Sequence, residues 1–289
     1  MPAVTDGTMK EEWRRAALDC LLETDPVAKC QRTLALWQRC QGGRLALDAG
    51  ARLPVPAMPG RPARPALVAP GRVPRRRFGS RAGRGILLHA LAHIEFNAIN
   101  LAWDAVCRFP GLPADFYADW SRIAAEEARH FQLLCGRLSD HGLAYGDLPA
   151  HDGLWAMARR TAADPLARMA LVPRVLEARG LDVTPAMIER FRQVGDGNTA
   201  EVLGVILREE VGHVQAGSRW YFHLCARRGL APLPLFRRLL LEYMQGRVKG
   251  PFHRQARREA GFTEEEMQML EDMELRARTG TPGSAEGSG

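Results

Sequence analysis

Six residues of this chain have the types and the spacing of ligands for a pair of metal ions. Twice in the sequence, a glutamate is followed 32 or 33 residues later by a Glu-x-x-His motif. The six residues are Glu95, Glu127 and His130 in the first copy, and Glu177, Glu210 and His213 in the second. Four carboxylates and two imidazoles of this kind form the ligand set of dinuclear carboxylate sites. The sequence therefore predicts two bound Fe ions, with two Mn ions as the alternative, because both metals accept these ligands.

The first copy lies on the apolar faces of two predicted helices. Residues 86–107 have an apolar stripe at helical spacing, and Glu95 is the only charged residue on it. The opposite face of this helix carries His89, His93, Asn97, Asn100 and Asp104. We expect the two histidines on that face to face solvent or to bond another element rather than to bind metal. Residues 114–138 form the next predicted helix, and Glu127 and His130 occupy core positions on it.

The second copy also lies on the apolar faces of predicted helices. Glu177 shares an apolar stripe within 166–179, and Glu210 and His213 share one within 199–222. Gly212 and Gly217 lower the helix propensity there, which is tolerable where a metal or a neighbouring backbone comes close. Burying such ionic groups is costly unless they are compensated, and two divalent cations would balance four carboxylates.

Two simpler explanations remain open for these residues. They are exposure on wrongly assigned helices and burial as ion pairs with nearby arginines, of which the candidates are Arg129, Arg179 and Arg208. A single Glu-x-x-His would favour either explanation, because the motif is short and arises by chance. The duplicated arrangement on apolar stripes favours the metal site.

The predicted fold class is all-α, with a ferritin-like four-helix bundle at its centre. The expected parts are an N-terminal helical extension (1–47, with a helical hairpin over 11–41), a Pro/Arg-rich arm without helix (48–85), the bundle (86–225), a C-terminal helical extension (226–278) and a disordered tail (279–289). Glu95 and Glu127 each lie 16 residues from Gly111 in the connecting loop, so an antiparallel pair brings them to the same height. A crossover over 139–164, with a short helix around Trp155, separates the two helix pairs.

The second helix pair is less regular in sequence than the first. Pro173 should kink the third helix, and Gly180 should end it soon after Glu177. Thr184-Pro185 should then begin another helix, and Asn198 should cap the fourth main helix. Glu177 is therefore the ligand with the weakest geometric support.

The positive charge of the chain is concentrated in the arm. The net charge is +7, but residues 49–94 contain nine arginines and no acidic residue, which leaves 31 basic against 33 acidic residues elsewhere. Such a segment is able to contact phosphates, although only Phe78 among the aromatic residues accompanies it. The alternative is an ordered arm whose arginines are solvated or paired with surface acids.

The sequence shows no targeting signal and no metal-binding cysteine motif. The N-terminus lacks the apolar stretch of a signal peptide, and no apolar run is long enough to span a membrane, so we expect a cytoplasmic protein without membrane contact. The six cysteines form no Cys-x-x-Cys motif and no zinc spacing, which argues against a fused rubredoxin-type module. Electrons would then come from an external reductase.

Several motifs resemble a family of bacterial ferritin-like proteins that is catalogued only as a domain of unknown function. They are Pro-Gly-Arg-Pro-Ala-Arg-Pro (59–65), His-Ala-Leu-Ala-His-Ile-Glu (89–95), Glu-Glu-Ala-Arg-His-Phe (126–131), Val-Leu-Glu-Ala-Arg-Gly-Leu-Asp (175–182) and Lys-Gly-Pro-Phe (249–252). The resemblance covers nearly the whole chain. More distantly, Glu-Ala-Arg (177–179) with Glu-Arg-Phe (189–191) is similar to the non-haem di-iron hydroxylase of a modified tRNA. The resemblance implies a carboxylate-bridged di-metal centre and supports Glu177 as a ligand, but it transfers no substrate.

The function expected from these observations is that of an O2-activating di-iron oxidase or hydroxylase. The alternatives are a ferroxidase or iron-handling protein, a peroxide-removing enzyme at a di-manganese or di-iron centre, and a helical bundle that binds RNA through the arginine-rich arm. Either a small molecule or a modified tRNA is compatible as substrate. The sequence does not determine the oligomeric state, and a dimer is one option.

Overall fold

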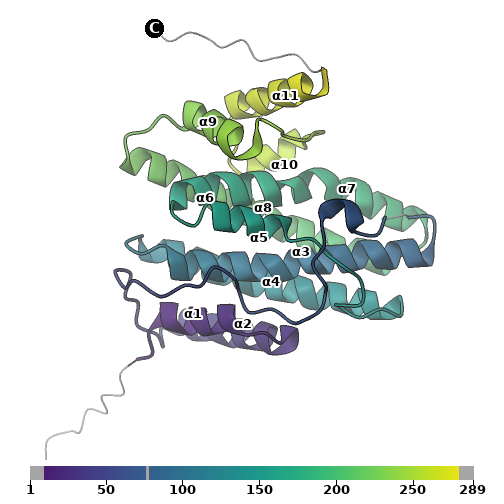
Figure 1. The fold of residues 1–289 in the computed structure, drawn as a ribbon, viewed down its shortest axis with the longest axis horizontal. Coiled ribbons are helices and arrows are strands. Elements are labelled where there is room, and N and C mark those ends of the chain that lie inside the picture. The colour runs from purple at the N-terminus through teal and green to yellow at the C-terminus, as the bar shows by residue number, and fades with distance from the viewer. Residues whose placement is uncertain (1–9, 76–77, 280–289) are drawn as a thin grey trace, which may run out of the picture. The chain divides into compact units, whose positions relative to one another are not determined.

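The computed structural model describes residues 10–75 and 78–279, and this part of the chain is all-α, with no β-strand (Figure 1). The chain divides into two compact units, residues 1–155 and residues 156–289. None of the described helices is both long and apolar enough to cross a membrane. The all-α class predicted from the sequence is therefore confirmed.

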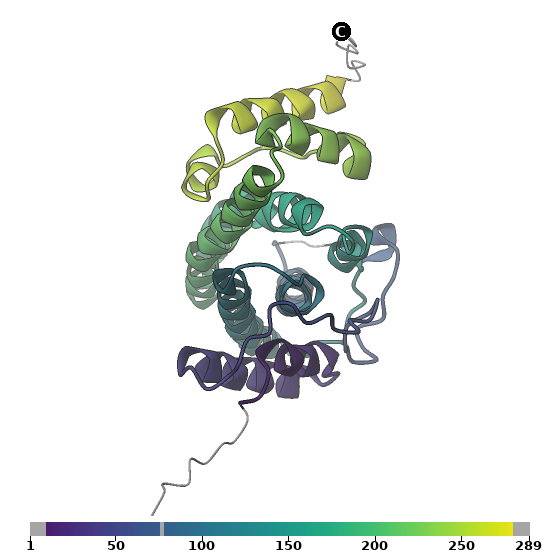
Figure 2. The ribbon, with the colours of Figure 1, turned by 90° about the vertical axis from the view of Figure 1, so that its left-hand side faces the viewer.

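The first unit is built on two paired helices and an N-terminal helical hairpin. Its helices are α1 (Trp13–Leu22), α2 (Pro26–Gln41), α3 (Arg81–Arg108) and α4 (Ala114–Asp140). The hairpin agrees with the prediction, and Asp25 caps α2 by accepting a 2.8 Å hydrogen bond from the Ala28 N–H. Helix α1 packs on α3 and α2 packs on α4, as the end-on view in Figure 2 also shows. The hairpin thus supports the α3–α4 pair, which carries the first motif.

Helix α3 begins five residues earlier than predicted. Ser80 caps it, because its Oγ accepts a 3.1 Å hydrogen bond from the Gly83 N–H. The prediction started the helix at residue 86, where the apolar stripe begins. Gly85 has a packing reason, since a Cβ at that position would lie 2.8 Å from a methyl group of Leu143.

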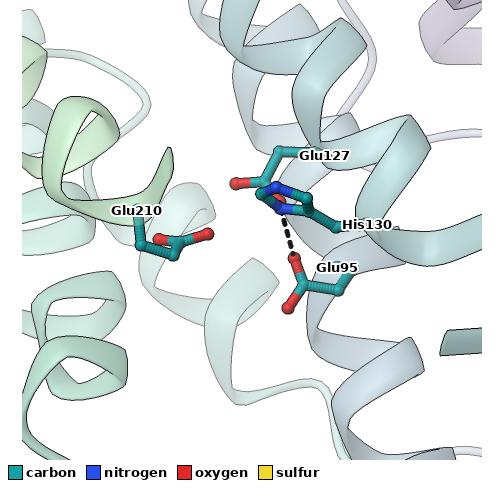
Figure 3. Close-up of side chains that lie close together, drawn as sticks. All are labelled: Glu95, Glu127, His130 and Glu210. Carbon is teal, nitrogen blue, oxygen red and sulfur yellow. Dashed lines mark hydrogen bonds and ion pairs between the residues drawn. The ribbon is translucent and has the colours of Figure 1, made fainter. Parts of the chain in front are cut away.

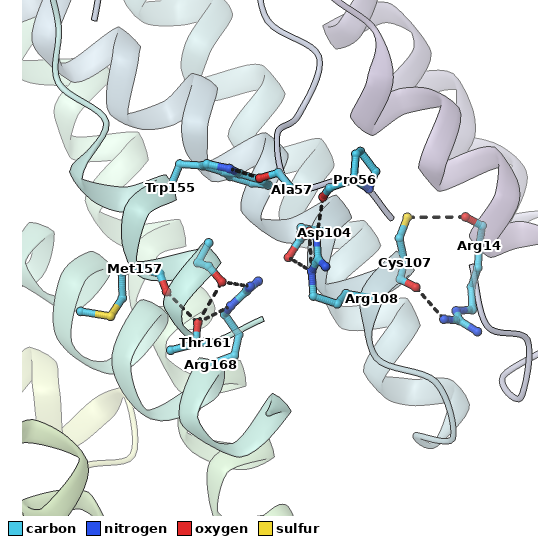
Figure 4. Close-up of polar contacts among 11 residues, drawn as sticks. Arg14, Pro56, Ala57, Asp104, Cys107, Arg108, Trp155, Met157, Thr161 and Arg168 are labelled. Carbon is cyan, nitrogen blue, oxygen red and sulfur yellow. Dashed lines mark hydrogen bonds and ion pairs between the residues drawn. The ribbon is translucent and has the colours of Figure 1, made fainter. Parts of the chain in front are cut away.

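The Pro/Arg-rich arm is ordered along most of its length and lies against the first unit. Its backbone carbonyls accept hydrogen bonds from Arg108 (at Pro56, 2.9 Å) and from the Trp155 indole (at Ala57, 2.9 Å), as Figure 4 shows. At Gly60 the arm comes so close to Leu22 that a Cβ would lie 2.1 Å from a backbone oxygen. Helix is not fully excluded from 48–85 as predicted, because a short 3-10 turn, η1 (Pro70–Arg72), and the first turn of α3 fall inside it.

The second unit contains the second motif and the C-terminal helices. Its elements are α6 (Pro165–Leu171), η2 (Val172–Glu177), α7 (Ala178–Gln193), α8 (Gly197–Arg227), α9 (Pro232–Met244), α10 (Arg254–Glu259) and α11 (Glu264–Thr279). Helix α5 (Gly153–Arg160), predicted around Trp155, crosses the boundary between the units. The tail predicted to be disordered lies outside the described residues from 280 onward, while Thr279 still belongs to α11.

The third predicted helix differs most from expectation. Gly180 does not end it and Thr184-Pro185 does not start a new one, because α6, η2 and α7 continue without a break from 165 to 193. Pro173 cannot donate a backbone hydrogen bond, and the chain absorbs this defect as the π-helical turn η2 rather than as a simple kink. Pro185 is accommodated inside α7.

Two helix starts follow side-chain caps. Asp196, rather than the predicted Asn198, caps α8, and its Oδ1 accepts a 3.1 Å hydrogen bond from the Thr199 N–H. Before α11, Thr263 and Glu266 exchange reciprocal hydrogen bonds with each other's backbone N–H groups at 3.2 and 3.0 Å. This is a capping box, a local sequence signal for a helix start.

Candidate metal centre

The first motif places two carboxylates around one imidazole inside the first unit. Glu95 projects from α3, while Glu127 and His130 project from α4 (Figure 3). Nδ1 of His130 lies 3.2 Å from Oε2 of Glu127 and 3.4 Å from Oε2 of Glu95. The three residues are 6%, 1% and 0% exposed, respectively. The sequence stripe therefore predicted the buried side of both helices correctly for this motif.

Burial and mutual repulsion disfavour the charged forms of the two carboxylates in this cluster. Burial, and then the neighbouring charge of Glu127, raise the pKa of Glu95 well above its ordinary value. Burial lowers the pKa of His130, but hydrogen bonds and charge from Glu127 and Glu95 outweigh it and raise that pKa to about 11. A divalent metal ion bound here would balance the charge of the carboxylates.

The opposite, polar face of α3 is also buried, and it is used for hydrogen bonds. Nδ1 of His93 lies 3.0 Å from the hydroxyl of Tyr145, and Nε2 of His89 accepts a 3.0 Å hydrogen bond from the Gly146 N–H. Farther along, the Lys29 ammonium donates to Oδ1 of Asn100 at 2.7 Å. The expectation of an inter-element hydrogen-bonding role for the two histidines is confirmed. The burial of α3 on all sides was not foreseen.

The second motif has its glutamate and histidine on one helix of the second unit. On α8, Nδ1 of His213 lies 3.3 Å from Oε1 of Glu210, which repeats the i, i+3 contact between Glu127 and His130. His213 has no exposed side-chain surface, whereas the Glu210 side chain is 12% exposed. The two Glu-x-x-His motifs therefore have the same local geometry but different degrees of burial.

Glu177 occupies the last position of the π-helical turn. Its Oε2 atom is buried, while the residue as a whole is partly exposed. The turn packs on α8, where a Cβ at Gly217 would lie 2.5 Å from the ring of Pro173. A close approach was predicted for Gly212 and Gly217, and it occurs only at Gly217, since a Cβ at Gly212 meets no atom within 4 Å. π-Helical turns inside α-helices often occur at functional sites.

Among the described residues of the first unit, Glu95, Glu127 and His130 belong to a group of side chains that could bind a metal ion (Figure 3). Glu177, Glu210 and His213 lie in the second unit. The complete six-residue ligand set stays a prediction. None of the cysteines joins the cluster, and all six are free thiols.

A buried ion pair beside the second motif escaped the sequence analysis. The Arg174 guanidinium, in the π-helical turn, donates a 2.7 Å hydrogen bond to Oε2 of Glu266 in α11, and both side chains are at most 1% exposed. The rings of Tyr221, Phe222, Phe236 and Phe262 surround the guanidinium carbon at 4.5 to 5.2 Å. The capping box at Thr263 signalled the helix start but not this pairing, because the two residues are 92 positions apart.

Comparisons with known proteins give a family but no activity. The family model described as "Protein of unknown function (DUF455)" matches residues 22–268. A relative from Haemophilus influenzae (strain ATCC 51907 / DSM 11121 / KW20 / Rd), described as "Uncharacterized protein", is 47% identical over 220 residues, which cover 74% of this chain and 76% of the relative. No solved structure matches the chain.

Proposed function

We propose that this chain, which belongs to the DUF455 family of proteins of unknown function, is a ferritin-like non-haem di-iron protein that acts as an O2-activating oxidase or hydroxylase. The observation that carries the proposal is the buried Glu95–Glu127–His130 cluster, in which two carboxylates meet one imidazole and burial raises the pKa of Glu95. Its donor types fit iron or manganese, and the absence of cysteine from it disfavours softer metals.

The second motif would complete a dinuclear site. In this proposal Glu177, Glu210 and His213 supply the same donor types as the first motif, so that four carboxylates balance two divalent cations. The contact between Glu210 and His213 supports this role, because it reproduces the contact made by Glu127 and His130. The two helix pairs, α3 with α4 and α6–α7 with α8, would correspond to the two halves of a ferritin-like bundle.

The residues of the chain would hold the metal and tune its surroundings. Glu127 and His130 face one another from adjacent turns of α4, so the helix fixes their separation before any ion binds. A pair of Fe(II) ions, when bound, supplies two electrons together to dioxygen, as an oxidase or a hydroxylase requires. Burial raises the pKa of the Cys20 and Cys30 thiols to about 12, so these cysteines are poor redox partners. A separate electron donor is therefore part of the proposal.

Matched pairs of adjacent glutamates test the metal assignment. We expect Glu127→Gln and Glu210→Gln each to weaken metal binding by more than about 100-fold, a larger loss than is typical for residues that only orient ligands. Glu126→Gln and Glu209→Gln are the controls, since these neighbours lie on another side of each helix and Glu126 pairs with Arg122 at 2.5 Å. Metal content is measured by mass spectrometry after anaerobic reconstitution, and circular dichroism checks the fold. Full metal occupancy in both ligand variants would refute the assignment.

The redox chemistry needs its own measurement. We expect about two irons per chain in protein from its own host, and a transient absorption band in stopped-flow mixing of the Fe(II) protein with O2. Two manganese ions with rapid loss of peroxide would instead indicate a peroxide-removing enzyme. Iron uptake into large symmetric oligomers would indicate iron storage. A single zinc ion would remove the basis for oxygen chemistry.

A further inference from the structure

The Pro/Arg-rich arm carries several exposed arginines that form no ion pair with a carboxylate of the described residues. Six of its arginines are exposed, namely Arg52, Arg61, Arg64, Arg72, Arg75 and Arg81. Within the described residues, none of these six forms an ion pair with a carboxylate, and residues 49–94 contain no acidic residue at all. Of the two forms expected for an ordered arm, solvated arginines or arginines paired with surface acids, these six residues show the first. The metal site proposed above makes no use of this surface.

The arm is held in place largely by its backbone. Among the six exposed arginines, the Arg81 guanidinium alone donates a hydrogen bond within the described residues, to the Asp140 carbonyl. Besides the bonds at Pro56 and Ala57, the Val68 N–H donates to the Ala150 carbonyl at 2.8 Å and the Ala150 N–H donates to the Ala66 carbonyl at 3.0 Å. Seven prolines between Pro54 and Pro74 further restrict the backbone. A fixed backbone lowers the entropic cost of binding a partner. The charges are thus displayed on an ordered segment of the first unit.

The composition of the arm favours phosphate as the group it contacts. All nine basic residues in 49–94 are arginines and none is lysine. Guanidinium groups bind phosphate through two parallel hydrogen bonds, whereas lysine acts as a point charge. We propose that the arm is a binding surface for the sugar–phosphate backbone of a polynucleotide.

A membrane surface fits the arm less well. Binding to a lipid surface usually combines basic charge with inserted apolar or aromatic side chains. In the arm, Met58, at 36% exposure, is the one large apolar side chain that is exposed among the described residues. Phe78, the one aromatic residue of the arm, is partly buried, so the arm offers no exposed ring on which a base could stack. The binding is therefore governed by backbone charge, with little dependence on base sequence.

The test compares two charge-matched variants of the full chain. The arm variant carries Arg61→Gln, Arg72→Gln and Arg75→Gln. The control variant carries Arg15→Gln, Arg237→Gln and Arg238→Gln, which are also exposed and have no side-chain partner among the described residues. Both lose three positive charges. Fluorescence anisotropy with a labelled 20-nucleotide single-stranded RNA, measured across a salt series, gives Kd and its salt dependence.

We expect the arm variant to raise Kd at least about tenfold and to reduce the slope of log K against log salt by about 2, since each phosphate contact contributes about 0.7. The control variant should bind like the wild type. Equal losses in the two triple variants would overturn the proposal, because net charge alone would then explain binding. Binding to vesicles of phosphatidylserine and phosphatidylcholine without binding to RNA, or binding to neither, would overturn it as well. Because metal binding is not the readout, failure here leaves the metal site unaffected.

Discussion

The two Glu-x-x-His motifs lie in parts of the molecule that handle buried charge differently. In the first unit, Glu95 and Glu127 crowd around His130 on two regular helices. In the second unit, the motif adjoins a π-helical turn that is tied down by the buried Arg174–Glu266 pair. A second buried pair, Arg257 with Asp182 at 2.7 Å, joins α10 to α7. The contacts around the first motif thus join buried carboxylates to a histidine, whereas the second unit pairs buried carboxylates with arginines.

The difference shows that two copies of a motif can be held by different backbone structures. The i, i+3 contact is the same in both units because helix geometry alone determines it. The partner glutamate is supported differently, by a straight helix at Glu95 and by the π-helical turn at Glu177. Substitutions at three places, namely Glu266, the glycines of α8 and Lys29, test this comparison of the two units.

The largest effect is expected for Glu266→Ala. This change leaves the buried Arg174 guanidinium without its carboxylate, which should lower the free energy of unfolding by about 3–5 kcal/mol. Hydrogen exchange with mass spectrometry should show faster exchange in η2 and α8, and little change in α3 and α4. The double variant Arg174→Met with Glu266→Leu is the control and should recover most of the loss, because it removes both charges. Uniform loss of protection in both units would contradict the contrast drawn between them.

An intermediate effect is expected at the contact between α8 and the π-helical turn. Gly217→Ala places a methyl group 2.5 Å from the rigid Pro173 ring, so overpacking should destabilise the protein by about 1–3 kcal/mol. Gly212→Ala, five residues earlier on the same helix, meets open space and should stabilise by about 0.5–1 kcal/mol through helix propensity. Urea denaturation measures both changes. If the two variants had the same sign, the close approach would not be what requires glycine.

The smallest effect concerns a buried cation in the first unit that has no carboxylate partner. Lys29 donates to two backbone carbonyls and to Asn100, and burial lowers its pKa to about 7. Between this value and the ordinary value of 10.5, the unfolded chain holds a proton that the folded chain does not, so stability should rise with pH across that window. The rise from Lys29 should be about 1 kcal/mol between pH 7 and pH 8.

Urea denaturation of the wild type and of Lys29→Met over pH 6.5–9.5 isolates this contribution. The variant lacks the titrating group, so the stability of the wild type relative to the variant should grow with pH. A difference that stays constant across the range would show that Lys29 keeps its ordinary pKa, and that the first unit tolerates this charge at no cost.

Much of the helical layout was predictable, because local signals agree with the final packing. Asp25 before Pro26 and Thr263 before Glu266 satisfy free N–H groups at helix starts wherever the helix lies. The apolar stripes likewise predicted that Glu95, Glu127 and His130 are buried. Gly180 misled the prediction, because packing of α7 on α8 outweighs the modest propensity cost of one glycine.

The sequence by itself determined the helices, the duplicated spacing of the motifs and the concentration of arginine in the arm, since each depends on residues close in the chain. Only the tertiary structure decided that α3 is buried on both faces, that Pro173 produces a π-helical turn against Gly217, and that Arg174 meets Glu266. These features join residues that are far apart in sequence. The interaction energies of these residues depend on burial and close packing, and neither can be predicted from the periodicity of one helix.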